Sequence, residues 1–261
     1  MVATAVYGVL TVGAVVLAAV AGLAAVQRLV PSTLRQEHND VAGFIYAVVG
    51  VIYAVVLALV LIAVWEEHEE ARATVRHETS ELAEVFWLAH RIPDPEGPQL
   101  QELARSYATV VAEEEWELMD RGEGSSPEAW AIMDEMRLIV QDMEVENRSD
   151  QVLFEQGLEY VGELADARRA RLAEAEEGIP AVLWAVLVLG GMITVGFAYL
   201  FGLDNTWTHR LMVASVAGLI ALVLFTIGDL EYPFSGGTRI GPEAFEFVLG
   251  RFETSALGNP R

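Results

Sequence analysis

Four residues of an uncharged apolar segment, 41–65, have the side chains and the spacing expected in the wall of an ion pathway. Tyr46, Gly50, Tyr53 and Leu57 recur at intervals of three and four residues, so a helix places them on one face. Inside a bilayer a tyrosine hydroxyl needs a hydrogen-bond partner, and a small residue lets helices approach closely. This face is therefore predicted to contact either another helix or a water-filled cavity. Helix packing is the simpler interpretation and a pore wall is the functional one.

Four polar residues precede this segment and are candidates for the mouth of such a pathway: Arg35, His38, Asn39 and Asp40. Asp40 is also a suitable N-cap, and its charge is favourable at a helix N-terminus. Capping therefore explains Asn39 and Asp40 without any further role. Arg35 and His38 beside them would attract anions at an outer mouth.

Acidic residues follow the segment where its helix would leave the membrane. Glu66, Glu67 and Glu70 would form a ring of carboxylates in a symmetric oligomer, and such rings concentrate cations at a pore entrance. A helix that simply returns to water gives the same pattern, so both interpretations stay open. A second acidic run, 113–117, is interpreted as a solvated helix face in preference to a cation site.

The chain contains no residue pattern typical of a catalytic centre. Cysteine is absent, which excludes disulfide and thiolate chemistry. His77 and Glu78 lack the second histidine of a zinc protease, and neither His68 nor His90 has an acidic residue three positions before it, as di-iron bundles require. We therefore expect no enzymatic activity, no catalytic residues, no metal site and no cofactor.

Four long apolar segments determine where these residues lie: 2–26, 41–65, 179–203 and 211–228. A spanning helix needs about 20 apolar residues, which three segments exceed and the fourth barely approaches. Each must be helical, because lipid offers no partner to an unpaired backbone group. The first segment lacks a basic leader and is longer than the apolar part of a signal peptide, so we interpret it as a span.

An acidic domain at 66–178 separates the second and third spans. It contains 30 acidic and 10 basic residues, which accounts for −20 of the chain's net charge of −22 and argues against a nucleic-acid partner. Its apolar residues recur at helical spacing between Pro- and Gly-rich breaks, and no stretch alternates as a strand would. Helices are predicted at 65–89, 100–119, 127–145 and 147–177.

These elements predict an all-α integral membrane protein with four transmembrane helices. Its parts are 1–65 with spans one and two, 66–178 as the inserted helical domain, 179–228 with spans three and four, and 229–261 as a tail with a short helix at 242–252. Six arginines near the membrane flank the domain side and three flank the short loops. By the positive-inside rule, the domain and both termini are expected in the cytoplasm, with the protein in the cell membrane.

The sequence resembles the bestrophin-like membrane proteins, long catalogued as a domain of unknown function, over nearly its whole length. The shared motifs begin with His38-Asn39-Asp40 and Gly43-Phe44-Ile45-Tyr46 and end with Asp229 to Gly236. Between them, the resemblance rests on these residues: Gly50, Tyr53, Trp65, Glu78, Tyr107, Glu115, Trp116, Arg168, Arg171, Pro180 and Trp184. The family is distantly similar to bestrophins, which are pentameric channels with a pore lined by the second span. This similarity implies the same arrangement here. The acidic cluster of the bestrophin calcium clasp is missing here.

We therefore predict a homo-oligomeric, pentameric ion channel in the lipid bilayer, with inorganic ions passing along an axis lined by the second span. The resemblance implies anions, whereas a vestibule of net charge −20 per subunit would enrich cations, so selectivity stays open. The alternative is a non-conducting signalling or scaffolding protein that acts through its helical domain. A wetted polar face on the second span favours the channel, and an axis blocked by Phe44, Val48 and Leu57 favours the scaffold.

Overall fold

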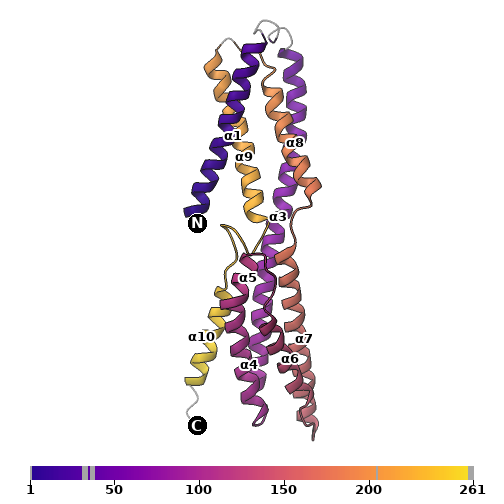
Figure 1. The fold of residues 1–261 in the computed structure, drawn as a ribbon. Helices are drawn as coiled ribbons and strands as arrows, with labels where there is room; N and C mark the ends of the chain where they lie inside the picture. Colours follow the sequence, from indigo (N-terminus) through magenta and orange to yellow (C-terminus); the bar gives the residue numbers. More distant parts are fainter. Residues whose placement is uncertain (1, 31–34, 36–38, 204, 258–261) are drawn as a thin grey trace. The chain divides into compact units, whose positions relative to one another are not determined.

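The computed structural model describes residues 2–30, 35, 39–203 and 205–257, and all regular structure in these ranges is helical (Figure 1). The predicted all-α class is confirmed, because the described part contains no strand. The chain divides into two compact units. Met1–Glu67 with Gly178–Glu231 form the first, called the membrane unit here, and His68–Glu177 with Tyr232–Arg261 form the second, called the acidic unit.

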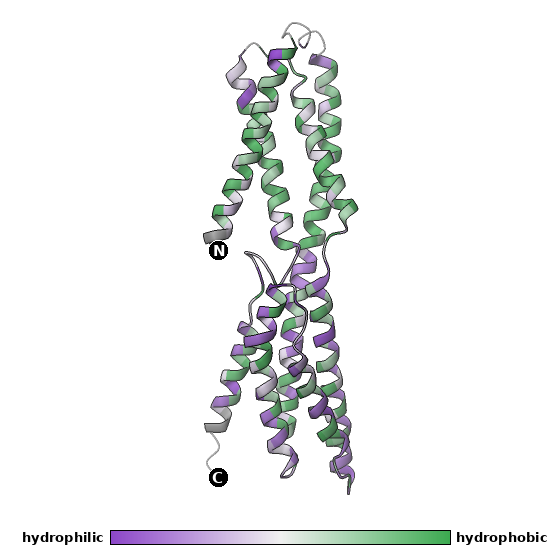
Figure 2. Cartoon of the chain, in the orientation of Figure 1, coloured by the Kyte–Doolittle hydropathy of each residue, from purple (hydrophilic) through white to green (hydrophobic). Residues whose placement is uncertain are grey.

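The described part of the membrane unit contains four long helices: α1 (Val2–Leu29), the first part of α3 (Asn39–Ala89), α8 (Ala181–Ala198) and α9 (Thr206–Leu230). Within the described residues, four helical stretches are long and apolar enough to cross a membrane, so the chain is a multi-pass membrane protein. Figure 2 shows the apolar residues along these helices and the polar residues concentrated in the acidic unit.

Helix α1 packs along α9 at close range. A Cβ atom added at Gly8 would lie 2.8 Å from the Phe225 ring, so this position admits only glycine without a shift of that ring. Helix α9 starts five residues before the predicted fourth span, because the Asn205 side chain accepts hydrogen bonds from the backbone N–H groups of Trp207 (3.0 Å) and Thr208 (3.2 Å). The fourth span is therefore longer than the apolar run alone indicated.

The acidic unit contains the second part of α3 and these helices: α4 (Glu96–Val110), η1 (Val111–Glu115), α5 (Trp116–Asp120), α6 (Pro127–Gln141), α7 (Arg148–Glu176) and α10 (Glu243–Leu257). The segment η1 is one π-helical turn within a continuous helix that also includes α4 and α5. Ser126 caps α6, with Pro127 in its first turn, and Asn147 with Asp150 forms a capping box at α7.

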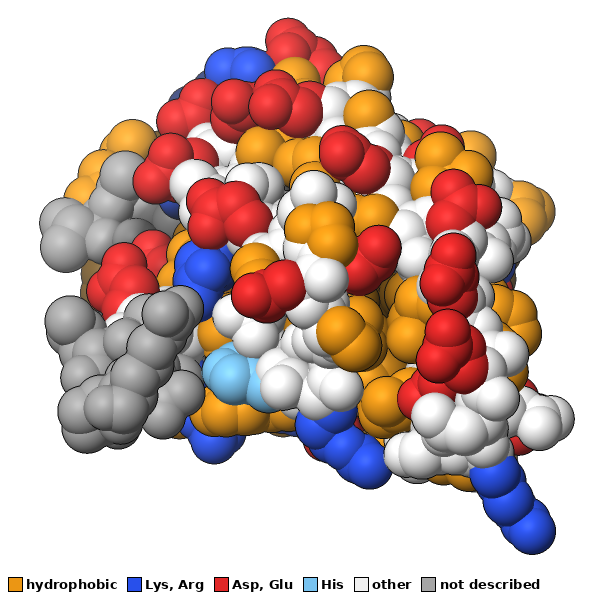
Figure 3. Space-filling view, turned by 90° about the horizontal axis from the view of Figure 1, so that it is seen from below, with side chains coloured by type: hydrophobic (Ala, Val, Ile, Leu, Met, Phe, Trp, Pro, Cys, Tyr) orange, Lys and Arg blue, Asp and Glu red, His pale blue; other side chains and the backbone are white. Residues whose placement is uncertain are grey.

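One apolar core holds the acidic unit together. Leu82 and Phe86 of α3, Leu100 of α4 and Met133 of α6 are fully or almost fully buried in it. Helix α10 adds Phe252, whose ring stacks on Phe86 with 3.9 Å between centroids. The surface is different in character: Figure 3 shows acidic side chains spread over the end of the molecule seen from below, with apolar patches between them.

Candidate functional site

Tyr53, the central residue of the predicted pore face, is buried inside the membrane unit. Its hydroxyl donates to the carbonyl oxygen of Leu187 on α8 (2.8 Å), and the residue is 7% exposed. The ring lies against two glycines of α8, since a Cβ atom at Gly190 would be 2.5 Å from two ring atoms and one at Gly191 would be 3.0 Å from the hydroxyl. The hydroxyl therefore has the partner that a tyrosine in a bilayer requires, within its own chain.

The other three residues of this face differ in their surroundings. The Tyr46 ring meets Phe201 edge to face, with 5.5 Å between centroids. Leu57 packs on an apolar cluster that includes Leu187 and Ile227. A Cβ atom at Gly50 would meet no atom within 4 Å. Helix packing accounts for these contacts within one chain, and a pore lined by the four residues stays a prediction for an assembly.

A different face of α3 is exposed in the single chain and forms a continuous apolar ridge, here called the outer ridge. Its members recur at helical spacing: Val41, Phe44, Val48, Ile52, Val55, Leu59 and Ile62. Glu66 and Glu70 continue the same spacing and are exposed, as is Glu67. Glu69, beside them, forms an ion pair with Arg72 (2.8 Å). The outer ridge is the part of α3 that is left for lipid or for a second copy of the chain.

The predicted mouth residues hold the segment that follows α8. The Asn39 side-chain amide donates to the Gly202 carbonyl oxygen (2.9 Å) and its oxygen accepts from the Gly202 N–H (3.0 Å). Arg35 is almost fully buried and donates through Nη1 to the carbonyl oxygens of Tyr199 (3.4 Å) and Phe201 (3.2 Å). Asp40 is exposed, and His38 lies outside the described residues.

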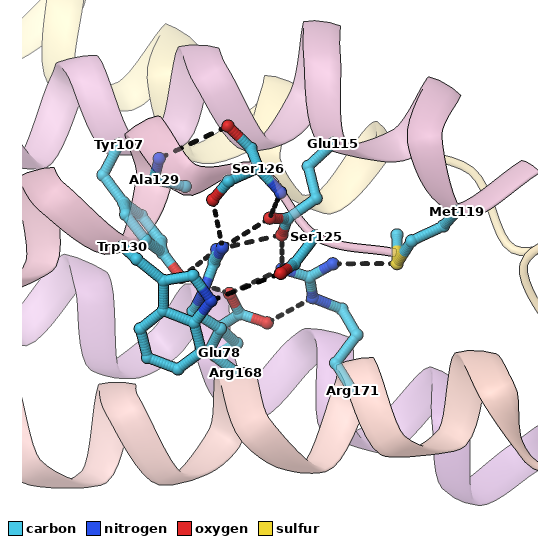
Figure 4. A network of polar contacts seen from close by, with 10 residues as sticks. All are labelled: Glu78, Tyr107, Glu115, Met119, Ser125, Ser126, Ala129, Trp130, Arg168 and Arg171. Carbon is cyan, nitrogen blue, oxygen red and sulfur yellow. Dashed lines mark hydrogen bonds and ion pairs between the residues drawn. The ribbon is translucent and has the colours of Figure 1, made fainter. Parts of the chain in front are cut away.

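A second arrangement, in the acidic unit, is a fully buried cluster of charged side chains, here called the charge cluster: Glu78, Tyr107, Glu115, Arg168 and Arg171 (Figure 4). Arg168 forms an ion pair with both oxygens of Glu115. Arg171 donates to both oxygens of Glu78, at 2.5 and 3.1 Å, and to Glu115 Oε1 at 2.6 Å. The two carboxylates balance the two guanidinium groups, which makes burial tolerable.

The cluster connects three continuous helices through these contacts. Glu78 lies on α3, Tyr107 on α4, Glu115 on η1 and both arginines on α7. Glu115 Oε2 also accepts the backbone N–H of Ser126 (2.8 Å), which fixes the start of α6. Aromatic rings cover the cations: the Arg168 guanidinium lies 4.6 Å from the Trp130 ring centroid, and that of Arg171 lies 5.0 Å from Trp116.

Electrostatics inside the cluster keep Tyr107 and Arg171 protonated. Burial and the Glu78 carboxylate raise the pKa of the Tyr107 hydroxyl well above its ordinary value, against the effect of the two arginines. The hydroxyl therefore stays protonated and donates to Glu78 Oε1 (2.6 Å). Burial opposes the charge of Arg171, but Glu78 and Glu115 outweigh it and raise the pKa of that guanidinium. A group that does not titrate suits a structural role.

The position of one member of the charge cluster was predicted wrongly from the sequence. Glu115 was assigned to a solvated acidic face, and for this residue that prediction is wrong, because its side chain is fully buried. Glu113, Glu114 and Glu117 are exposed, as predicted. A usable signal was present: Val75, Glu78 and Leu82 share a helical stripe, and a glutamate within an apolar stripe needs a cationic partner. Among the described residues no three acidic or histidine side chains are placed to hold a metal ion.

The stability of the acidic unit is expected to rise as the pH falls from 7 toward 5. Burial raises the pKa of Glu81, against the effect of His77, and burial likewise raises the pKa of Glu174, against its hydrogen bond from Thr74. The folded state therefore binds these protons more tightly than the unfolded state. Their stabilising contribution is complete below the unfolded value of 4.5 and is lost as the pH rises through the folded values.

Melting temperatures of the purified protein between pH 7 and pH 5 test this. The double variant Glu81→Gln/Glu174→Gln should show a smaller rise than the wild type. The double variant Glu113→Gln/Glu114→Gln removes two charges from an exposed surface and controls for the change in net charge. Equal slopes for both double variants would contradict a specific contribution from Glu81 and Glu174.

Comparison with known proteins agrees with this architecture. The bestrophin-like domain matches residues 13–245 of the chain. A solved structure described as that of a membrane protein superposes with a TM-score of 0.63 over 94% of this chain and 99% of the other, at 12% sequence identity. At that identity the likeness concerns the fold alone. No curated protein matches the chain.

Proposed function

Because the chain belongs to the bestrophin-like family, we propose that it assembles into a homo-oligomeric ion channel, a pentamer by analogy with bestrophins. The proposal is carried by the family match over residues 13–245, and α3 supports it. This helix extends without a break from a membrane span into the acidic unit, Asn39 to Ala89. It also exposes an apolar ridge that a single chain leaves uncovered. Neighbouring copies would cover part of this ridge and enclose an axis with the rest.

The pore in this proposal is lined by α3. Tyr46, Tyr53 and Leu57 hold α3 against the rest of the subunit, and Gly50 lies on that same face, opposite the outer ridge that would face the axis. Asn39 and Asp40 mark one mouth. Glu66, Glu67 and Glu70 form a ring at the other, which favours entry of cations. By the distribution of arginines, the acidic unit and both termini face the cytoplasm of a cell-membrane protein.

One observation favours the non-conducting alternative. The outer ridge carries Phe44 and Val48, and the Tyr53 hydroxyl is engaged inside the subunit, so the exposed face of α3 is apolar over its whole span. An axis closed by these side chains would exclude water and ions. The protein would then be a membrane-anchored scaffold whose acidic unit binds a signalling partner.

Current recorded from the purified oligomer in a planar bilayer under a KCl gradient separates the two functions. The channel predicts discrete openings whose reversal potential gives the permeant charge. Because Glu66 and Glu70 attract cations, the variant Glu66→Gln/Glu70→Gln is expected to shift the reversal potential toward that of chloride. The variant Glu113→Gln/Glu114→Gln removes the same number of charges outside the proposed ring and serves as the control. Silence from an intact oligomer across voltage, pH and calcium would reject the channel and support the scaffold.

A further inference from the structure

A cavity of about 480 Å³ opens between α1, α8 and α9 of the membrane unit. Small residues such as Ala18, Gly196 and Ala217 form part of its wall. Its two hydroxyl groups are already engaged: Thr11 donates to the Tyr7 carbonyl oxygen (2.9 Å) and Tyr199 donates to that of Ala19 (2.9 Å). The wall offers no free polar group, so the cavity suits a hydrocarbon occupant better than water or a polar ligand.

The length of the cavity fits one acyl chain of a phospholipid. Its wall extends along α1 from Thr11 to Ala19 and along α8 from Val188 to Tyr199, which corresponds to about 12 and 16 Å of helix. This is about half of the ~30 Å hydrocarbon core, or one leaflet.

A cation contacts one residue of the cavity wall. Tyr199 is the last lining residue on the α8 side, and its carbonyl oxygen accepts from Arg35 Nη1 (3.4 Å), although Arg35 itself does not line the cavity. Arg35 is 9% exposed, its Nε has no hydrogen-bond partner, and no described carboxylate pairs with its charge. A buried guanidinium with an unused donor favours an anion, and a phosphate group accepts such donors well.

We propose that the membrane unit binds one phospholipid from the leaflet on the Arg35 side. One acyl chain occupies the cavity between α1, α8 and α9, and the phosphate contacts Arg35. The inference requires only that the chain spans a membrane and does not depend on whether it conducts ions. It assigns Ala18, Gly196 and Arg35 to a lipid site that is separate from α3.

Native mass spectrometry of the oligomer, stripped of lipid in detergent and then incubated with phosphatidylglycerol, tests the proposal. We expect about one retained lipid for each chain, because each membrane unit holds one such cavity and one Arg35. Gly196→Leu fills the cavity without a clash, since a Cβ atom there meets nothing within 4 Å. The leucine side chain would occupy the space that the acyl chain needs, so most of the retained lipid should be lost.

Gly13→Leu is the matched control, because Gly13 lies on α1, also has open space within 4 Å, and does not line the cavity. It should retain lipid as the wild type does. Arg35→Gln should weaken binding of phosphatidylglycerol but leave binding of a fatty alcohol, which has no phosphate, unchanged. Ala18→Leu narrows the cavity from the α1 side and serves if Gly196→Leu does not fold.

Two outcomes would overturn the proposal. Undiminished retention in Gly196→Leu and Ala18→Leu would place the lipid elsewhere. If these variants form a smaller oligomer but retain as many lipids per chain as the wild type, the cavity is a contact between subunits. A phospholipid with a photoreactive acyl chain gives an independent result on the wild-type protein. It should label peptides that contain Val15 or Met192, and labelling confined to the outer ridge of α3 would reject the site.

Discussion

Replacing Arg171 by methionine is expected to lower the free energy of unfolding by about 3–5 kcal/mol, because breaking a buried ion pair leaves an uncompensated charge. The change leaves Glu78 fully buried, and among the described residues its remaining hydrogen-bond partner is the Tyr107 hydroxyl. It also removes one of the two cations that Glu115 contacts. Guanidinium denaturation of the full chain in detergent, followed by tryptophan fluorescence, measures the loss. Trp116 lies beside the Arg171 guanidinium and reports on this region directly.

Arg169→Met is the matched control for this experiment. Arg169 lies on the same helix and pairs with Asp166, but more than half of its side chain is exposed. Surface pairs of this kind contribute about 0–1 kcal/mol, so the control should change stability little. Adding Glu78→Gln to Arg171→Met removes the stranded charge and should restore part of the loss. Equal destabilisation by the two methionine variants would contradict a structural role for the charge cluster.

Replacing Gly190 by alanine is expected to destabilise the membrane unit by about 1–3 kcal/mol, the usual cost of overpacking a filled site. The new Cβ atom would lie 2.5 Å from two atoms of the Tyr53 ring, which its hydrogen bond to Leu187 holds in place. The ring can move only if that bond is given up. The melting temperature of the protein in detergent, with far-ultraviolet circular dichroism as the signal, measures the change.

Gly196→Ala on the same helix controls for the change in helix propensity, since its Cβ atom would meet nothing within 4 Å. It should be neutral or slightly stabilising, because alanine is the better helix former by about 1 kcal/mol. The double variant Tyr53→Ala/Gly190→Ala should lose less than the two single variants combined, since the second change relieves the first. Additive losses would show that Gly190 and Tyr53 do not share a contact.

Much of the fold was predictable because it follows from local composition. Long uncharged runs identified the spans, and Ser126 with Pro127 identified the start of α6. The start of α9 was missed because residues 206–210 are mostly polar and do not belong to the apolar run, although the helix already begins after the Asn205 cap. The end of α6 at Gln141 was placed four residues too late for a similar reason, since Met143 and Val145 are apolar but lie beyond the last helical turn.

The sites were harder to predict because they depend on contacts between distant parts of the chain. Periodicity showed that Tyr53 lies on a face that needs a partner, but it does not say which helix supplies that partner. The charge cluster joins residues up to 93 positions apart. Arg168 and Arg171 share one face of α7 by their spacing of three, but no local rule pairs them with Glu115 and Glu78.

The π-helical turn at Val111–Glu115 has a consequence for the evolutionary record of the family. Such a turn corresponds to one extra residue within an α-helix, so it rotates everything that follows relative to a regular helix. A homologue with an unbroken α-helix here would be one residue shorter and would carry a different residue at the Glu115 position. Alignments of this family should therefore place a single-residue gap at the exposed Glu113 or Glu114. Homologues that have this gap should also lack an arginine at the Arg168 position, because the glutamate that pairs with it is absent.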